Sequence, residues 1–332
     1  MTSTELIQKA IRYDPLPRMP VAVLDGYNWF FRHSDMTEQA LYALPSREAA
    51  AFLLKQYERV GSDLTYVGPL AGGAVREILA GRTGRSPVFS APEDAARFSA
   101  EELCREAESH PLLGVLAGLL EEMNRQLAGE KPILAFGAGP LTSAAGYLGM
   151  ENLMMALTED PDSVEILLDF CTDVTIRLLR FQVEHGATGM SIADPVSAVN
   201  LISEPFFLRF SLPRIRRITD AFRGSGLPIM LHICGNSAPR IAPLRDSGIH
   251  IYSMDAVDLR WAQEEAKGAF AIFGNLNTVS VMLESSPDRV YSQARELCLT
   301  APTGFILAPG CDLPPDTPEE NIRAMIRAAH SV

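Results

Sequence analysis

Short apolar segments that alternate with helical segments along almost the whole chain are the feature that most restricts its fold. Most of these segments are rich in Val, Ile, Leu and Phe, which is typical of parallel strands that are buried on both faces. The stretches between them show the helical spacing of apolar residues, so the sequence predicts an α/β fold. The eight predicted strands are residues 20–24, 63–68, 132–137, 189–194, 228–234, 249–255, 269–275 and 305–310.

Eight strands with intervening helices predict a single (β/α)8 TIM barrel that spans residues 1–332, and a doubly wound open sheet is the alternative. The segment of about 71–130 exceeds a simple crossover between two strands, and we expect it to form an inserted helical cap over the barrel mouth. Two helix starts are also indicated. Ser163, which follows Pro161, is the expected N-cap of one helix, and residues 317–320 form a capping-box-like start for the last helix.

Composition and charge exclude several classes of protein. The chain is 47% hydrophobic and 21% charged, which is ordinary for a globular protein. Its formal net charge is −12 and its basic residues are scattered, so we expect no nucleic-acid partner. We expect no membrane association, because no uncharged apolar stretch is long enough to cross a bilayer. An odd number of cysteines, five, and the absence of a signal-like N-terminus predict a cytoplasmic location.

Two short motifs predict a metal site. Residues 231–236 and 307–311 each end an apolar run, and together they supply His232, Cys234 and Cys311. One imidazole and two thiolates, with a fourth position left open, are typical of a catalytic zinc site. Such an ion can bind a thiol, remove its proton and present a nucleophilic thiolate. A lone His-x-Cys would be a weak pattern because buried cysteines are common, but the second motif strengthens it.

Two other patterns are interpreted as structural. The remaining cysteines, Cys104, Cys171 and Cys298, lie in helical segments and are expected to be core or surface thiols. The glycine-rich segment 137–139 resembles the start of a dinucleotide-binding fingerprint, but Thr142 stands where the third glycine is required. We therefore expect no nucleotide cofactor.

Polar residues follow the ends of most predicted strands, which is where the active sites of such barrels lie. We take Asp194, Asp255 and Asn275 as the candidate catalytic residues. Asp194 and Asn275 are expected to orient the substrate. Asp255 is expected to be either a fourth metal ligand or a hydrogen-bond partner of His232. The expected substrate-binding residues are Asp25, Tyr27 and Gly139.

The motifs at residues 232–236, 274–277 and 306–311 resemble the C-terminal half of the uroporphyrinogen decarboxylase superfamily. Within it they are similar to the corrinoid-dependent branch, the methylcobalamin:coenzyme M methyltransferases, and residues 314–322 fit that branch well. The resemblance implies a barrel whose zinc is held by the residues matching the two motifs above. It also implies transfer of a methyl group between a corrinoid carried by a partner protein and a small acceptor, such as the thiol of coenzyme M.

The loop after the first predicted strand separates this chain from the true decarboxylases. Those enzymes use arginines there to hold the porphyrin's carboxylates, whereas this chain has Asp25 and Tyr27, and its first arginine after the strand is Arg32. The chain also lacks an Asp-x-His-x-x-Gly corrinoid-binding pattern, so the corrinoid should arrive on another protein. The aromatic residues within 27–31 are expected to form either a packed lid or an apolar wall facing the substrate or the corrin ring.

The sequence is also compatible with other functions. The same barrel could decarboxylate an acidic substrate, and a decarboxylase of this kind would contain no stoichiometric zinc. It could use tetrahydrofolate or a methylated donor in place of a thiol. It could also be a non-catalytic zinc-binding partner within a methyltransferase complex. The direction of methyl transfer cannot be assigned from the motifs.

Overall fold

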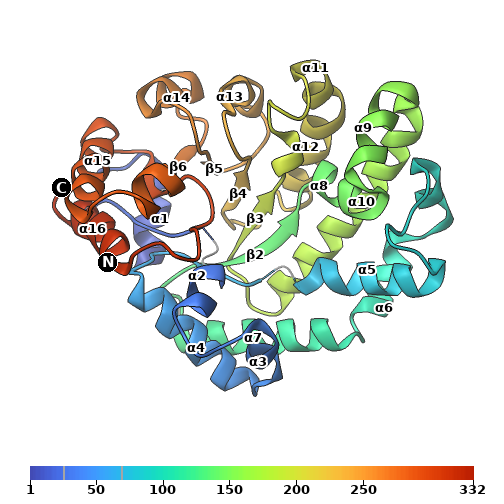
Figure 1. Cartoon of the computed structure of the whole chain (residues 1–332), viewed down its shortest axis with the longest axis horizontal. Coiled ribbons are helices and arrows are strands. Elements are labelled where there is room, and N and C mark those ends of the chain that lie inside the picture. Colours follow the sequence, from blue (N-terminus) through green and yellow to red (C-terminus); the bar gives the residue numbers. More distant parts are fainter. Residues whose placement is uncertain (25–26, 69) are drawn as a thin grey trace.

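One parallel sheet of seven strands, hydrogen-bonded in chain order from β1 to β7, lies at the centre of the computed structural model (Figure 1). The structure describes residues 1–24, 27–68 and 70–332. The helices pack around this curled sheet, so the core is formed by its strands and the inner faces of the helices. The strands are β1 Thr65–Tyr66, β2 Ile133–Ala138, β3 Gly189–Ala193, β4 Ile229–His232, β5 Ile251–Ser253, β6 Ala271–Leu276 and β7 Phe305–Pro309.

Each of these strands lies largely within a predicted strand segment, but the first predicted segment, residues 20–24, differs. It forms a single parallel bridge between Val21 and Leu307 of β7, while Val21 O accepts a hydrogen bond from the Asp63 N–H at 2.7 Å. The N–H groups of Val21 and Val23 donate to the side chains of Asp63 and Ser62. Because side chains take the place of backbone acceptors, residues 20–24 form no regular ladder there, and the described residues form a sheet of seven strands rather than the eight predicted.

Helices connect the successive strands and make up most of the remaining chain. The α-helices are α1 Ser3–Ile11, α2 Tyr27–Arg32, α3 Glu38–Ala43, α4 Ser46–Arg59, α5 Leu70–Thr83, α6 Ala100–Ala107, α7 Pro111–Leu127, α8 Pro140–Leu148, α9 Met150–Glu159, α10 Pro161–Glu184, α11 Glu204–Phe206, α12 Leu212–Ala221, α13 Ala238–Leu244, α14 Leu259–Ala266, α15 Pro287–Thr300 and α16 Glu319–His330. Four further turns of helix are the 3-10 segments η1 Pro92–Arg97 and η2 Pro195–Ser197 and the π segments η3 Phe207–Ser211 and η4 Thr278–Leu283.

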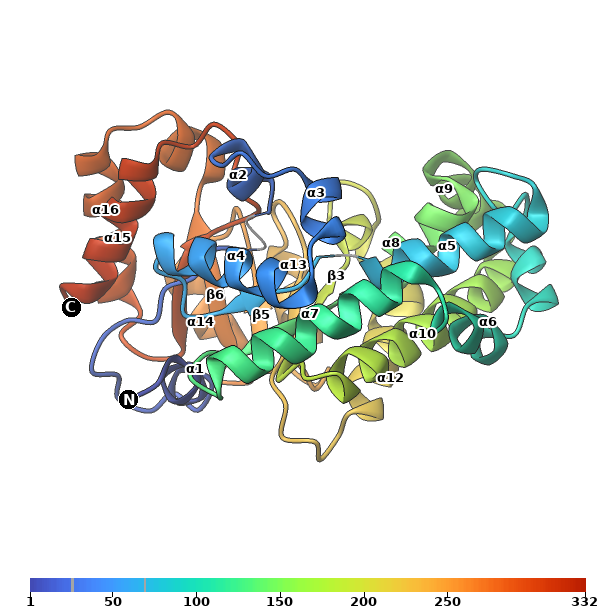
Figure 2. The same ribbon diagram turned by 90° about the horizontal axis from the view of Figure 1, so that it is seen from below.

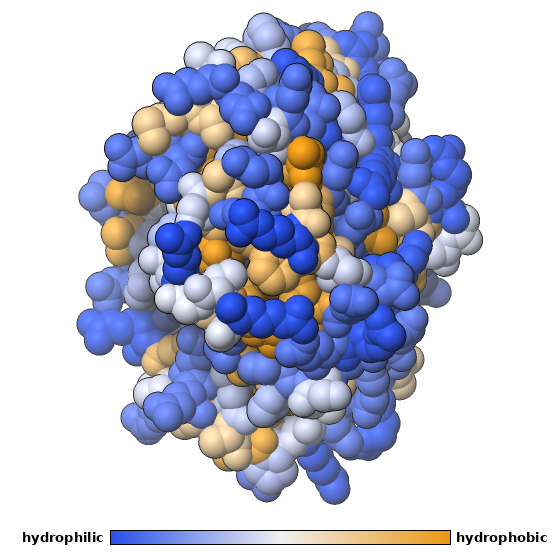
Figure 3. Space-filling view, turned by 90° about the vertical axis from the view of Figure 1, so that its right-hand side faces the viewer, coloured by the Kyte–Doolittle hydropathy of each residue, from blue (hydrophilic) through white to orange (hydrophobic). Residues whose placement is uncertain are grey.

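The predicted cap segment of about 71–130 contains most of α5 together with η1, α6 and α7. Helix α7 packs against α4 and β2, while α6 and η1 pack against the long helix α10. Figure 2 shows α5, α6, α9 and α10 extending together beyond one side of the sheet. These contacts do not confirm a cap over the mouth. Figure 3 shows the face on the right of Figure 1, where hydrophilic side chains cover most of the surface and apolar ones appear in a central recess.

Both predicted helix starts need correction. Helix α10 begins at Pro161 with Asp160 as its N-cap, and the Asp160 carboxylate accepts a hydrogen bond from the N–H of Ser163. The last helix, α16, begins at Glu319 after Pro318, without a side-chain cap. The proline explains the first case, because its missing N–H and fixed φ suit the first helical position. No described helix combines the length and the apolar sequence that a membrane crossing requires.

Asp63 anchors the N-terminal segment to the start of β1. Its buried carboxylate accepts hydrogen bonds from the Ser3 hydroxyl at 2.6 Å, from both terminal nitrogens of Arg18 at 2.7 Å and from the Val21 N–H at 3.0 Å. Burial acts to raise the pKa of Asp63, but the hydrogen bonds from Arg18, Ser3 and Val21 outweigh it and lower the pKa below its ordinary value. The anchor therefore depends on the ionised carboxylate.

Candidate metal centre

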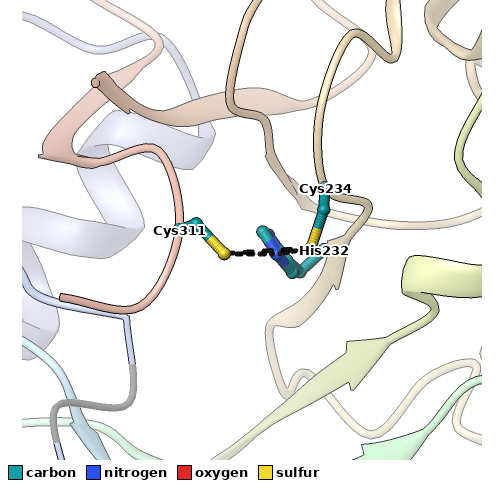
Figure 4. A group of neighbouring side chains, drawn as sticks. All are labelled: His232, Cys234 and Cys311. Atoms are coloured by element: carbon teal, nitrogen blue, oxygen red, sulfur yellow. Dashed lines mark hydrogen bonds between the residues drawn. The ribbon is translucent and has the colours of Figure 1, made fainter. Parts of the chain in front are cut away.

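Two separate strands bring the predicted metal ligands together (Figure 4). His232 is the last residue of β4 and Cys234 follows in the loop, while Cys311 lies just beyond the end of β7. The Nε2 atom of His232 lies 3.1 Å from the Cys234 Sγ and 3.8 Å from the Cys311 Sγ, and the two sulfurs are 3.8 Å apart. In the described part of the chain, no other three His, Cys, Asp or Glu side chains form such a group.

These distances fit a tetrahedral metal ion. Zn–S bonds of about 2.3 Å and Zn–N bonds of about 2.0–2.1 Å imply an S···S separation of about 3.8 Å and an N···S separation of about 3.6 Å. The S···S separation of 3.8 Å and the His232–Cys311 separation of 3.8 Å lie close to these values, and the His232–Cys234 separation of 3.1 Å is shorter than the tetrahedral value. One imidazole and two sulfurs also suit zinc better than calcium or magnesium, which prefer oxygen ligands. The three residues can therefore hold a metal ion.

The two thiols of this group ionise unequally. Hydrogen bonds from Cys234 and then His232 lower the pKa of Cys311 to about 4, although burial opposes this. The contact with Cys311, followed by burial, raises the pKa of Cys234. The second proton is therefore hard to remove while the first sulfur carries the charge. A cation that replaces the shared proton would gain both sulfurs as ligands, because metal ligation requires the thiolate form.

Asp255 lies between the loops that carry the two cysteines. Its Oδ2 atom accepts a hydrogen bond from the N–H of Gly235 at 3.3 Å, and a Cβ atom on Gly310 would lie 2.6 Å from Asp255 Oδ1. Burial, followed by the charge of Cys311, raises the pKa of this carboxyl group. Asp255 is not among the donors that lie within 4.8 Å of one another, so its predicted ligand role remains a prediction.

Asp194 forms a buried hydrogen-bond hub at the end of β3. Its Oδ1 accepts from the N–H and hydroxyl of Thr142 at 2.9 and 2.8 Å, and its Oδ2 accepts from Ser197 and Ser211 at 2.5 and 3.0 Å. Gly139 lies against it, since a Cβ atom there would come within 2.3 Å of the Asp194 Cβ. These contacts join α8, η2 and η3, so both residues shape the loops around the strand ends.

The other predicted site residues lie in different surroundings. Asn275 donates a hydrogen bond from Nδ2 to the carbonyl of Val257 and lines a pocket between α14 and α15. Tyr27 is buried in α2, and its hydroxyl reaches the carbonyl of Tyr66 in β1 at 3.4 Å. Asp25 falls outside the residues that the structure describes. The structure therefore brings the three predicted metal ligands together with Asp255 beside them, while the side chain of Asp194 belongs to a separate hydrogen-bond network.

The aromatic segment in α2 is largely a packed layer. Trp29 and Phe30 are completely buried, and the Trp29 Nε1 donates to the carbonyl of Thr317 at 2.8 Å. Of the two expectations for this segment, these two side chains fit the packed lid. Asn28 is exposed on the same helix, and its Nδ2 donates to the carboxylate of Asp312 at 2.9 Å. This hydrogen bond connects helix α2 to Asp312, the residue that follows Cys311.

Sequence reasoning missed Ser253, which contacts His232 directly. The Nδ1 atom of His232 lies 2.9 Å from the Ser253 hydroxyl, and the two residues are register partners in β4 and β5. Pairing each strand with its successor in the predicted barrel could have found it, because Ser253 lies in the strand segment that follows His232. Thr142, Ser197 and Ser211 were missed as well, because only the folded chain brings them to Asp194.

Comparisons with known proteins show the family to which this chain belongs. The family described as Uroporphyrinogen decarboxylase (URO-D) matches residues 58–332, so the chain belongs to the uroporphyrinogen decarboxylase family. The methylated-thiol–coenzyme M methyltransferase of Methanosarcina mazei is 30% identical over 243 residues, which are 73% of this chain and 63% of that protein. The chain thus spans less than two thirds of that relative's length.

A second relative matches over nearly its full length. The methylcobamide:CoM methyltransferase of Methanosarcina acetivorans is 26% identical over 345 residues, covering 99% of this chain and 97% of that protein. The solved structure of a methyltransferase from Methanosarcina mazei has the same fold, with a TM-score of 0.84, 21% identity and coverage of 100% of this chain and 99% of its own. The predicted resemblance to the uroporphyrinogen decarboxylase superfamily and to its methyltransferase branch is confirmed.

Proposed function

We propose that the chain is a zinc-dependent methyltransferase that moves a methyl group between a corrinoid protein and a small acceptor, a thiol such as coenzyme M. The observation that carries the proposal is the convergence of His232, Cys234 and Cys311 within 4.8 Å of one another. The activities for which the two relatives are named support the corrinoid and the thiol as substrates. The donor set supports zinc, because a site with three ligands leaves a position for a substrate sulfur.

The chain's own residues hold and shape this centre. His232 Nε2 and the sulfurs of Cys234 and Cys311 are the proposed ligands. A bound zinc ion would supply Lewis acidity, which lowers the pKa of a substrate thiol and keeps its sulfur nucleophilic at neutral pH. Asp255, beside both cysteine loops, is the candidate for the fourth position when no substrate is bound. Asp194 and Gly139 are proposed to position the loops around the strand ends, and Asn275 to orient the substrate from β6.

Methyl transfer to the acceptor forms a carbon–sulfur bond and breaks the methyl–cobalt bond, whose electron pair stays with the corrinoid. The corrinoid is a substrate on a partner protein, so the strand ends must remain accessible to it. The loop around Arg32 supports a methyltransferase over a decarboxylase. That guanidinium pairs with the exposed carboxylate of Asp316 at 2.7 Å, and so it is engaged at the surface by an acidic group.

A second proposal concerns closure of the seven-stranded sheet. We propose that residues 20–24 close the sheet into a barrel, because Pro20 and Ala22 bond to Leu307 of β7 on one side and Val21 bonds to Asp63 before β1 on the other. Residues 1–332 would then form one domain, with the segment of about 71–130 as its largest insertion. All five cysteines are free thiols, which supports the expected cytoplasmic location.

The test combines metal analysis with a transfer assay. The purified, metal-replete protein should contain about one zinc ion per chain. It should also demethylate free methylcobalamin when coenzyme M is added, which is followed through the cobalamin absorbance. Tetrahydrofolate and simple thiols serve as alternative acceptors, and uroporphyrinogen tests decarboxylation. A zinc-free preparation that releases carbon dioxide from an acidic substrate would refute the proposal. Bound zinc without transfer to any acceptor would favour a non-catalytic partner.

A further inference from the structure

A hydrogen bond between Nδ1 of His232 and Ser253 affects which ring nitrogen is able to bind a metal. His232 Nδ1 and the Ser253 hydroxyl oxygen are 2.9 Å apart, and the exposed fractions of the two residues are 4% and 0%. The other ring nitrogen, Nε2, points toward the two sulfurs (Figure 4). The two nitrogens of one ring are thus assigned to different partners, one to the group of sulfurs and one to the interior of the sheet.

A neutral imidazole carries one N–H, and a metal can bind only the nitrogen that keeps its lone pair. If Nε2 binds the ion, Nδ1 must carry the proton, and in a buried position that proton needs an acceptor. The hydroxyl oxygen of Ser253 is the atom in place to accept it. We propose that Ser253 is a positioning residue that holds His232 in the tautomer and orientation required for Nε2 to bind the metal, an inference that rests on the proposed metal site.

The strand register makes this assignment specific. His232 and Ser253 are direct partners in the parallel pairing of β4 with β5, so their backbones are fixed relative to each other. A serine side chain has one rotatable bond before its oxygen, and therefore little freedom to leave the ring. If the hydroxyl instead donated to Nδ1, the ring proton would sit on Nε2 and face the sulfurs. Metal binding excludes that arrangement, so the bound ion and the Ser253 acceptor select the same tautomer.

The experiment compares Ser253→Ala with Ser191→Ala. Ser191 is a buried serine in the neighbouring strand β3 and serves as the matched control, because the same oxygen is removed away from the ligand group. Zinc affinity is measured by competition with a chromophoric chelator, and the melting temperature of the metal-free protein is measured in parallel. Ser253→Ala should bind zinc about 10- to 100-fold more weakly, as is typical when a ligand's hydrogen-bond partner is lost, while Ser191→Ala stays near wild type.

A purely structural role would give a different pattern. It would lower the metal-free melting temperature of Ser253→Ala and leave the zinc affinity of the folded fraction unchanged, which would overturn the proposal. Ser253→Thr retains the hydroxyl and should recover most of the affinity. A direct measurement on the wild type does not depend on any variant folding. Long-range ¹H–¹⁵N spectra of the zinc-bound protein should show a proton on Nδ1 of His232 and the metal on Nε2.

The two proposals can fail separately. If wild-type protein binds zinc and Ser253→Ala binds it equally well, the role of Ser253 is refuted while the metal site stands. If the zinc-bound spectra place the metal on Nδ1, the inference is refuted in the same way. If metal-replete wild-type protein binds no zinc at all, the proposed function itself fails, and the inference about Ser253 falls with it.

Discussion

Cys234 and Cys311 behave as a pair whose charge resides mainly on one sulfur. The thiol of Cys311 has a pKa of about 4 because it receives hydrogen bonds from Cys234 and His232, whereas the pKa of Cys234 is raised. In contrast to Cys311, burial raises the pKa of the core thiol Cys298 to about 12. The lowered pKa of Cys311 separates this pair from the core cysteines, since the thiolate is the form that binds metals and attacks electrophiles.

The first prediction tests that pair. Cys311→Ser should lose stoichiometric zinc and reduce methyl transfer from free methylcobalamin by at least about 100-fold, because one of two thiolate ligands is removed. The protein should remain folded by circular dichroism. Cys298→Ser is the control, because it changes a buried helical thiol outside the ligand group and should keep its zinc. Full activity per folded molecule in Cys311→Ser would refute the proposed mechanism.

The second prediction concerns the close approach of Gly139 to Asp194. A Cβ atom in Gly139→Ala would lie 2.3 Å from the Asp194 Cβ and would push that side chain from its four hydrogen bonds. We expect a loss of about 2–3 kcal/mol in the free energy of unfolding, measured by urea denaturation. Gly146→Ala in α8 meets no atom within 4 Å and should be neutral or slightly stabilising. Equal effects of the two substitutions would contradict the assigned role.

Residue identities predicted the grouping of His232, Cys234 and Cys311, but not what surrounds these residues. The motif containing His232 and Cys234 is visible because its donor types and spacing are unusual. Asp194 was expected to orient the substrate because it ends a strand. The sequence could not show that both of its carboxylate oxygens are occupied by hydroxyl and backbone donors. Ser253 was missed for a related reason, since its contact with His232 depends on the register of two strands.

At the scale of elements, the strands were easier to predict than the segment that joins the two edges of the sheet. The runs around β2 to β7 are apolar and continuous, so burial determines their structure. Residues 20–24 are equally apolar, but Ser62 and Asp63 supply side-chain acceptors to the N–H groups of Val21 and Val23. Competition between a side chain and the backbone for the same donor is not visible in hydrophobic spacing.

The third prediction is a pH dependence of this N-terminal anchor. The native pKa of Asp63 is lowered, so its ionised form stabilises the fold above about pH 4, its unfolded pKa, and this contribution is lost as pH falls through the lower native value. Asp63→Asn should cost about 2–3 kcal/mol in the free energy of unfolding at pH 7, because Arg18 loses its buried partner. The difference from wild type should shrink toward zero in strongly acidic urea titrations.

A matched control uses an exposed ion pair. Asp316 pairs with Arg32, but their side chains are 69% and 63% exposed, so Asp316→Asn should change stability little at any pH. If Asp63→Asn showed the same small and pH-independent effect, the carboxylate would not anchor the N-terminal segment. A destabilisation that persisted unchanged at low pH would indicate lost packing rather than lost charge.

At the scale of the whole molecule, one sheet carries strands drawn from most of the chain. Residues of β1 and β7 lie at its two edges, and the segment around Val21 bonds to the β7 edge and to the residues preceding β1. The alternation of strands and helices predicted this arrangement. The predicted cap is not confirmed, because segment length alone does not show whether an insertion packs over a mouth or along a side.

The fourth prediction follows from this continuity. The chain should unfold in one cooperative transition, with circular dichroism and tryptophan fluorescence giving coincident curves in urea. Limited proteolysis should cut surface loops first and release no separately folded half, because each half would expose an unpaired strand edge. Two stable fragments, or two resolved transitions, would show that the chain contains independent domains.

The separation of the two cysteines along the chain also links metal supply to folding. Cys234 and Cys311 are 77 residues apart, so an ion that bridges them acts as a removable cross-link between distant strands. In the chain-entropy treatment of cross-links, closing a loop of that length is worth on the order of 4 kcal/mol through the unfolded state. Because the metal would bind the folded chain, the free energy of unfolding would also increase with the free metal concentration. If the proposed metal site is correct, a shortage of the ion would therefore leave a protein that is both less active and easier to degrade.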